Sequence, residues 1–178
     1  MRILLVFGPL LLMILAEVGA ATLTGRVLRV SDGDTLVVLG PGGAHYTVDL
    51  AGAVAPRPDQ PYGEAARQRL NERAAGRFVV VDYRDRRDAS HLVGRAMVGR
   101  QDLGLDQISS GLAWYREVDS SILSSKEQET YKKAMEQARR VRRGLWHIED
   151  PTPPWRERQQ FRCIPPSQWP PGPPGQDE

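Results

Sequence analysis

The sequence has few of the residues that form covalent or metal cross-links. Cys163 is the only cysteine among 178 residues, so the chain cannot form an intramolecular disulfide and its core must hold without one. In an oxidising compartment this cysteine is either a small buried side chain or an intermolecular link. The three histidines, His45, His91 and His147, are far apart, and no spacing of Cys and His is typical of a zinc site.

The chain also lacks a large excess of charge of one sign. Its formal net charge of +2 at pH 7 is too small for bulk attraction to nucleic acid, so any such role must depend on where the charge lies. Charged residues make up 26% of the chain and hydrophobic residues 40%, which is normal for a globular protein. The length fits one domain with terminal extensions.

A hydrophobic run long enough to cross a membrane is missing. Residues 3–15 are apolar, but a bilayer-spanning helix needs about 20 residues. Arg2 precedes this run and small residues follow it, which predicts a signal peptide over residues 1–20, cleaved after Ala20 or Ala21. The alternative is an uncleaved anchor. We therefore expect an exported protein, periplasmic or secreted, with no transmembrane segment beyond the signal peptide.

What the chain does contain is a series of short β-branched runs separated by turn residues. Alternation predicts strands over residues 25–30, 35–39, 45–50, 77–83 and 91–98. Helical spacing predicts helices over residues 61–75, 103–110 and 127–143, the last preceded by a capping box of Ser125 and Gln128. The pattern indicates an α+β, mainly β fold, a five-stranded OB-fold barrel with three helices, although strand counting alone leaves other α+β folds open. The domain should occupy residues 21–155, with a proline-rich C-terminal tail over 156–178.

The stretch Asp32-Gly33-Asp34-Thr35 lies between the first two predicted strands. Asp-Gly between apolar runs is a strong hairpin signal, and a tight turn brings Asp32 and Asp34 together at one end of the sheet. Carboxylates held this close need a cation or a basic group to compensate their charge. The alternative is that Asp-Gly serves as turn chemistry alone.

Basic residues concentrate in two stretches. The charged run over residues 84–88 is most simply a solvated turn. The predicted helix over 127–143 has a basic side, which is either a solvated face or a contact for nucleic acid. Its members are Lys132, Lys133, Arg139, Arg140, Arg142 and Arg143.

Short motifs spread along the chain carry a resemblance to a known family. They are DGDT at 32–35, LAG at 50–52, AP at 55–56, PYGEA at 61–65, GR at 94–95, GLAWY at 111–115, RGLW at 143–146 and PPW at 153–155. With these motifs in this order, residues 23–155 resemble the staphylococcal (micrococcal) nuclease family. The resemblance implies an OB barrel with helices and the hydrolysis of DNA and RNA phosphodiesters with one calcium ion.

Carried over residue by residue, the family pattern is only partly present. Asp34 matches the first calcium-binding aspartate, and Arg95 matches one of two arginines that clamp the phosphate. Asp49 stands where the family has the other arginine. Val54 stands where the family has its second aspartate, and Arg57 stands where it has its general base.

These substitutions predict reduced or lost phosphodiesterase activity. Valine offers no side-chain oxygen to calcium, whose binding should be weakened, and arginine cannot accept a proton. One arrangement is that Asp49 and Arg57 pair with each other. In the alternative, Asp34 and Asp49 share a cation, Arg57 and Arg95 bind phosphate and Asp59 replaces the base. That rearranged site would make the protein an active calcium-dependent endonuclease.

The candidate site residues follow from this carry-over. The predicted catalytic residues are Arg95, Arg57 and Asp49, and the predicted metal ligands are Asp34, Thr35 and Asp49. Arg95, Arg57 and Tyr115 are predicted to contact nucleic acid. A protein partner is the second possibility, because an extended proline-rich tail docks readily into aromatic grooves. The sequence predicts no oligomeric state.

Overall fold

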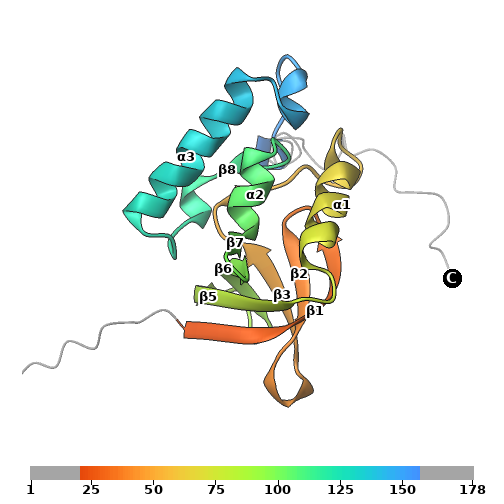
Figure 1. The fold of residues 1–178 in the computed structure, drawn as a ribbon, viewed down its shortest axis with the longest axis vertical. Helices are drawn as coiled ribbons and strands as arrows, with labels where there is room; N and C mark the ends of the chain where they lie inside the picture. Colours follow the sequence, from red (N-terminus) through yellow and green to blue (C-terminus); the bar gives the residue numbers. More distant parts are fainter. Residues whose placement is uncertain (1–20, 157–178) are drawn as a thin grey trace, which may run out of the picture.

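The computed structural model describes residues 21–156 of the chain (Figure 1). The predicted signal peptide over residues 1–20 lies outside the described residues, and so does the predicted tail from residue 157 on, including Cys163. No helix of the described part is both long and apolar enough to cross a membrane.

Five strands close into a barrel, which confirms the predicted α+β, mainly β, OB-type fold. They are β1 (Ala21–Asp32), β2 (Thr35–Leu39), β3 (His45–Leu50), β5 (Phe78–Arg86) and β6 (His91–Val98). Neighbouring strands pair antiparallel in the order β3-β2-β1-β5-β6, and a parallel pairing of β3 with β6 closes the ring. Outside the barrel, β7 (Gln101–Asp102) pairs antiparallel with the end of β6, and β4 (Ala53–Val54) pairs with β8 (Trp114–Tyr115).

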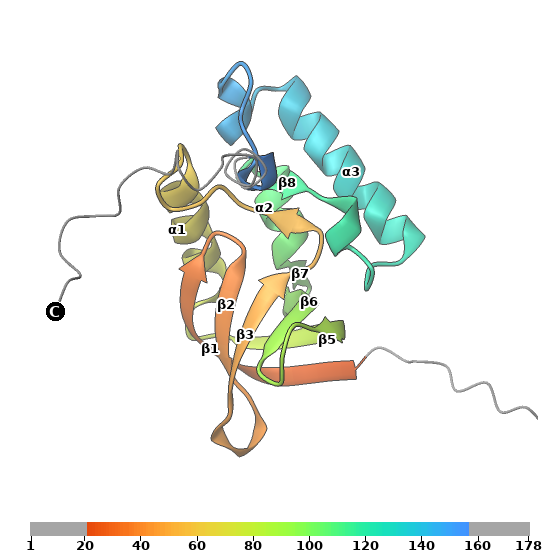
Figure 2. The same ribbon diagram turned by 180° about the vertical axis from the view of Figure 1, so that it is seen from behind.

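Three α-helices lie toward one end of the barrel, away from the β2–β3 connection (Figure 1, Figure 2). They are α1 (Gly63–Ala74), α2 (Leu103–Ser109) and α3 (Ser125–Arg140). The predicted helices are therefore all present. Short 3-10 turns complete the chain at η1 (Pro41–Gly43), η2 (Glu117–Asp119) and η3 (Gly144–His147).

The capping box of α3 is formed by Ser124 and Glu127, so the predicted Ser125–Gln128 box is off by one residue. The Ser124 Oγ accepts from the Glu127 backbone N–H, and the Glu127 carboxylate accepts from the Ser124 N–H. Glutamate at this third position also suits the positive end of the helix dipole.

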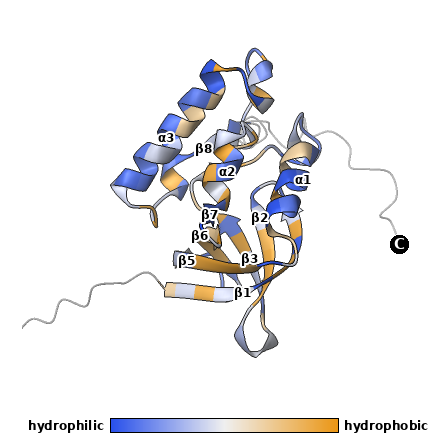
Figure 3. Ribbon diagram, viewed as in Figure 1, coloured by the Kyte–Doolittle hydropathy of each residue, from blue (hydrophilic) through white to orange (hydrophobic). Residues whose placement is uncertain are grey.

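The core fills the barrel and continues under α1. Inward-facing Val and Leu side chains such as Leu36, Val48 and Leu92 are fully buried, as the period-two alternation predicts. On α1 the buried stripe includes Ala66, Leu70 and Ala74. Figure 3 shows hydrophobic colouring along the strands, whereas α3 is largely hydrophilic.

A buried carboxylate, Asp102, ties the barrel to the helices. Asp102 Oδ1 accepts from the α2 backbone at Leu105 (3.0 Å) and from the Tyr131 hydroxyl of α3 (2.6 Å). Its Oδ2 accepts from Arg95 Nε of β6 at 2.7 Å, and Arg95 Nη1 lies 2.5 Å from Glu127. Burial, and then the charge of Asp102, raise the pKa of the Tyr131 phenol, so it remains a donor. One side chain therefore fixes two helices against one strand.

The Asp102→Asn substitution should lower the free energy of unfolding by about 2–4 kcal/mol, because Arg95 loses one of its two charged partners in a partly buried network. Urea unfolding of the mature domain measures this. Glu64→Gln, which breaks the exposed Glu64–Arg67 pair, is the control and should leave the transition midpoint unchanged. Equal effects of the two substitutions would show that Asp102 does not hold the helices in place.

Candidate active-site pocket

A cavity of about 320 Å³ opens beside the β1–β2 turn. Its walls come from that turn, the end of β3, the β4 segment, the start of β6 and the segment that contains Pro154 and Trp155. Of the predicted site residues, Asp34, Thr35, Asp49 and Arg57 line this cavity together.

The β1–β2 turn is held in place by packing beneath Gly33. A Cβ atom at Gly33 would lie 2.6 Å from the Cβ atoms of both Ala55 and Ala66, so only glycine fits. The buried Gln107 amide donates to the Gly33 and Ala66 carbonyls. The glycine of the Asp-Gly pair therefore lets the turn pack closely against α1 and α2. This packing fixes the position of the neighbouring Asp34.

Asp34 and Asp49 converge on one hydroxyl. Thr35 Oγ1 lies 3.1 Å from an oxygen of each carboxylate, and the second Asp34 oxygen accepts from the Ala55 N–H at 2.8 Å. Burial raises the pKa of Asp34 from 3.8 to about 6, and the charges of Asp32 and Asp49 add to this, against the hydrogen bonds from Ala55 and Thr35. Because Thr35 has one hydroxyl proton, it can donate to only one of the two carboxylates at a time.

Asp49 is compensated by Arg87, and the Asp49–Arg57 pair, one of the two predicted arrangements, is absent. Arg87 Nη2 lies 3.2 Å from Asp49 Oδ2. His91 Nε2 approaches the same oxygen to 3.0 Å without hydrogen-bond geometry. Arg57 instead lies 3.5 Å from the exposed Asp59, at the mouth of the cavity. The predicted Asp49–Arg57 pair does not form because β3 pairs with β6. This pairing places Asp49 beside the start of β6 and the turn between β5 and β6.

Arg95 does not line this cavity, contrary to its expected place beside Asp34. Its guanidinium is held by Asp102 and Glu127, and the β6 residue that faces Asp49 in the cavity is His91. Tyr115 also lies elsewhere. Its ring contacts Tyr131 edge-on with centroids 6.0 Å apart.

Sequence reasoning missed four residues that line the cavity: Arg87, His91, Arg116 and Trp155. Arg87 was assigned to a solvated turn and His91 to a strand without a role. Arg116 pairs with Asp119 at 3.0 Å, and its guanidinium lies 5.3 Å from the centroid of the Trp155 ring. The excess of basic residues in the 84–88 run is a signal, but only the fold shows that Arg87 reaches the mouth of the cavity.

The residues present do not fit a tightly held calcium ion. Calcium takes about six to eight oxygen ligands, whereas here the two carboxylates that share Thr35 are Asp34 and Asp49, and Asp49 already has the Arg87 guanidinium beside it. Val54 lines the cavity with an apolar side chain. Within residues 21–156, no group of three or more His, Cys, Asp and Glu side chains is placed to hold a metal ion.

Asp34→Asn should remove a pH dependence of stability. Since the pKa of Asp34 is raised from 3.8 to about 6 in the folded state, the native protein binds more protons than the unfolded chain between these values. This contribution makes wild-type stability fall as the pH rises from 4 to 6, by at most about 3 kcal/mol. Urea unfolding of both proteins from pH 4 to 7 measures the difference. A difference that stays constant with pH would show that Asp34 titrates normally.

The comparisons with known proteins agree with this architecture. Residues 47–148 match the family model described as "Staphylococcal nuclease homologue". An "Uncharacterized endonuclease" of Escherichia coli is 32% identical over 152 residues, which cover 83% of this chain and 93% of the relative. A protein of the same name from Haemophilus influenzae is 26% identical, covering 90% of this chain and 88% of the relative. The "Probable endonuclease LCL3" of Clavispora lusitaniae is 29% identical, covering 73% and 69%.

The matched family model covers most of the described chain. The barrel and the cavity beside the Asp-Gly-Asp-Thr turn agree with the family that it names. The chain belongs to the staphylococcal nuclease family.

Proposed function

We propose that this domain binds nucleic acid through its phosphates at the Asp34 cavity and has little or no calcium-dependent phosphodiesterase activity. The observation that carries the proposal is that Asp49, one of two carboxylates that a metal would need, already has the Arg87 guanidinium 3.2 Å from its Oδ2. The names of the endonuclease relatives support nucleic acid as the ligand class. Export, based on residues 1–20, is part of the proposal, and N-terminal sequencing of the mature protein would test it.

The cationic groups at the mouth of the cavity are available to a phosphate. The side chains of Arg57 and Arg87 are 48% and 60% exposed, so a phosphate can reach both. The partner of Arg57, Asp59, is 74% exposed, and such surface pairs are weak. Guanidinium groups bind phosphate oxygens in a bidentate way, which suits a phosphodiester at this mouth.

Two groups that the family pattern uses for hydrolysis, the general base and a metal ligand, are replaced at this site. Arg57 stands where the family pattern expects the general base, and no guanidinium accepts a proton at physiological pH. The loss of one positioned catalytic group commonly costs about 10²- to 10⁴-fold in rate, and here the base and a metal ligand are both replaced. A bound phosphodiester should therefore persist.

An active calcium-dependent endonuclease with a rearranged site is the second candidate. It is favoured by one contact, the shared Thr35 hydroxyl that brings the Asp34 and Asp49 carboxylates together. In that arrangement calcium would have to displace Arg87 from Asp49 before the two carboxylates could bind it.

Binding should depend on the two exposed arginines. The double variant Arg57→Ala/Arg87→Ala should bind a labelled single-stranded DNA dodecamer about tenfold more weakly in chelator, with a smaller salt dependence, because two phosphate contacts are lost. Fluorescence anisotropy at several salt concentrations measures both quantities. Arg77→Ala, which removes an exposed arginine that does not line the cavity, is the matched control. Equal affinities of the two variants would contradict the proposal.

Hydrolysis should appear only when the pocket is rebuilt. The wild-type domain should not cleave DNA or RNA with calcium, whereas the variant Asp49→Arg/Val54→Asp/Arg57→Glu/His91→Arg should gain cleavage that chelator abolishes. The fourth change supplies an arginine at the β6 position that faces the cavity. Gel assays of labelled substrates measure this. Chelator-sensitive cleavage by the wild type that is lost in Asp34→Ala would establish the active alternative instead.

A further inference from the structure

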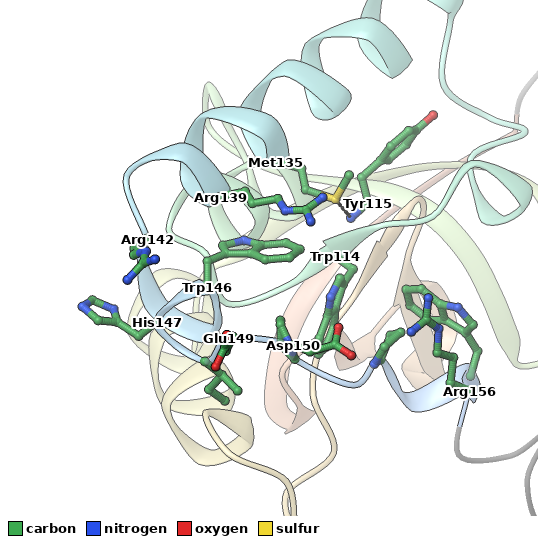
Figure 4. A pocket seen from close by; sticks show the side chains of 14 residues that line it. Trp114, Tyr115, Met135, Arg139, Arg142, Trp146, His147, Glu149, Asp150 and Arg156 are labelled. Atoms are coloured by element: carbon green, nitrogen blue, oxygen red, sulfur yellow. Dashed lines mark hydrogen bonds between the residues drawn. The ribbon is translucent and has the colours of Figure 1, made fainter.

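A second cavity of about 730 Å³ lies between β8, α3 and the segment from η3 to Arg156 (Figure 4). Three of the four tryptophans of the chain line it, namely Trp114, Trp146 and Trp155. The Trp114 ring meets the other two edge-on, with centroids 6.3 Å from Trp146 and 5.9 Å from Trp155. We call this feature the tryptophan cavity.

We propose that the tryptophan cavity is a base-stacking subsite for single-stranded nucleic acid whose backbone is bound at the Asp34 cavity. This inference rests on the proposed function and adds the form of its ligand, an unpaired strand. Aromatic faces beside cationic groups are the usual means of binding single strands without sequence preference.

The two cavities share a wall. Trp155 lines both of them, and Arg116, which lines the Asp34 cavity, lies over the Trp155 ring with its guanidinium 5.3 Å from the ring centroid. A strand that leaves the phosphate site past Trp155 is therefore at the edge of the tryptophan cavity.

The charges of the tryptophan cavity fit an anionic strand. Arg139, Arg142 and Arg156 line it and have no ion pair with any other described residue. Arg139 lies over the Trp146 ring, with its guanidinium 5.7 Å from the ring centroid. Arginines already lie over the rings of Trp146 and Trp155. They would repel a cationic ligand, so the three rings do not act as an aromatic cage for a cation.

Hydrogen-bonding groups in the tryptophan cavity favour bases over an acidic peptide. Trp146 Nε1 is buried without a hydrogen-bond partner among the described residues, so it is a donor that a base carbonyl can satisfy. Glu149 and Asp150 line the opposite side and can accept from base amino groups.

The test compares three oligodeoxycytidylates in chelator, a trimer, a dodecamer and a dodecamer with abasic sites at its central positions. Trp146→Ala should weaken binding of the intact dodecamer by about tenfold and leave the trimer and the abasic dodecamer unchanged. Arg139→Gln should weaken the dodecamer severalfold without disturbing the core, since Arg139 is exposed. Its matched control is Arg140→Gln, the next residue on α3, which is exposed but does not line the cavity.

The outcomes separate this inference from the proposed function. If every oligonucleotide binds, and binding depends on Arg57 and Arg87 but not on Trp146 or Arg139, the phosphate site stands and the stacking subsite is overturned. If the intact and abasic dodecamers bind equally well, stacking is likewise overturned. If a polyglutamate peptide binds in a Trp146-dependent way while the dodecamer does not, the cavity takes a protein partner. If no oligonucleotide binds, both proposals fail.

Discussion

Parallel hydrogen bonding between β3 and β6 joins Thr47 to His91 and Asp49 to Val93, and it closes the barrel. The two strands are separated in sequence by α1 and β5, so their contact is the long-range step on which the Asp34 cavity depends. Without it, Asp49 would not meet His91 or Arg87. The same closure turns Arg95 toward Asp102, where it supports the helices instead of the cavity.

The compensation of buried carboxylates explains how the site differs from the family pattern. A pair of acidic residues beside a cavity needs countercharge, which a metal ion supplies in the family pattern. Here the Arg87 guanidinium lies 3.2 Å from Asp49, and burial raises the pKa of Asp34 to about 6. The cavity is therefore balanced by the chain itself, with exposed guanidinium groups left at its mouth.

The helices add a second surface to this barrel. Asp102 holds α2 and α3 against β6, and α3 in turn places Arg139 over Trp146. The Trp114 ring on β8 anchors the two other indoles edge-on. A network far from the phosphate site thereby shapes the tryptophan cavity, and Trp155 joins the two cavities.

The sequence by itself determined the five barrel strands, the three helices and the Asp-Gly-Asp-Thr turn, because each depends on neighbours in the chain, whereas the two-residue strands β4, β7 and β8 were not predicted. It also identified Val54 and Arg57 as departures from the family pattern, since both follow β3 closely and the turn residues fix their position. Only the tertiary structure decided that His91 rather than Arg95 faces the cavity, and that Asp49 pairs with Arg87 rather than with Arg57. Alternation along β6 places His91 and Arg95 in equivalent positions, and the physical difference between them is which end of the strand meets β3 and which end meets α2 and α3.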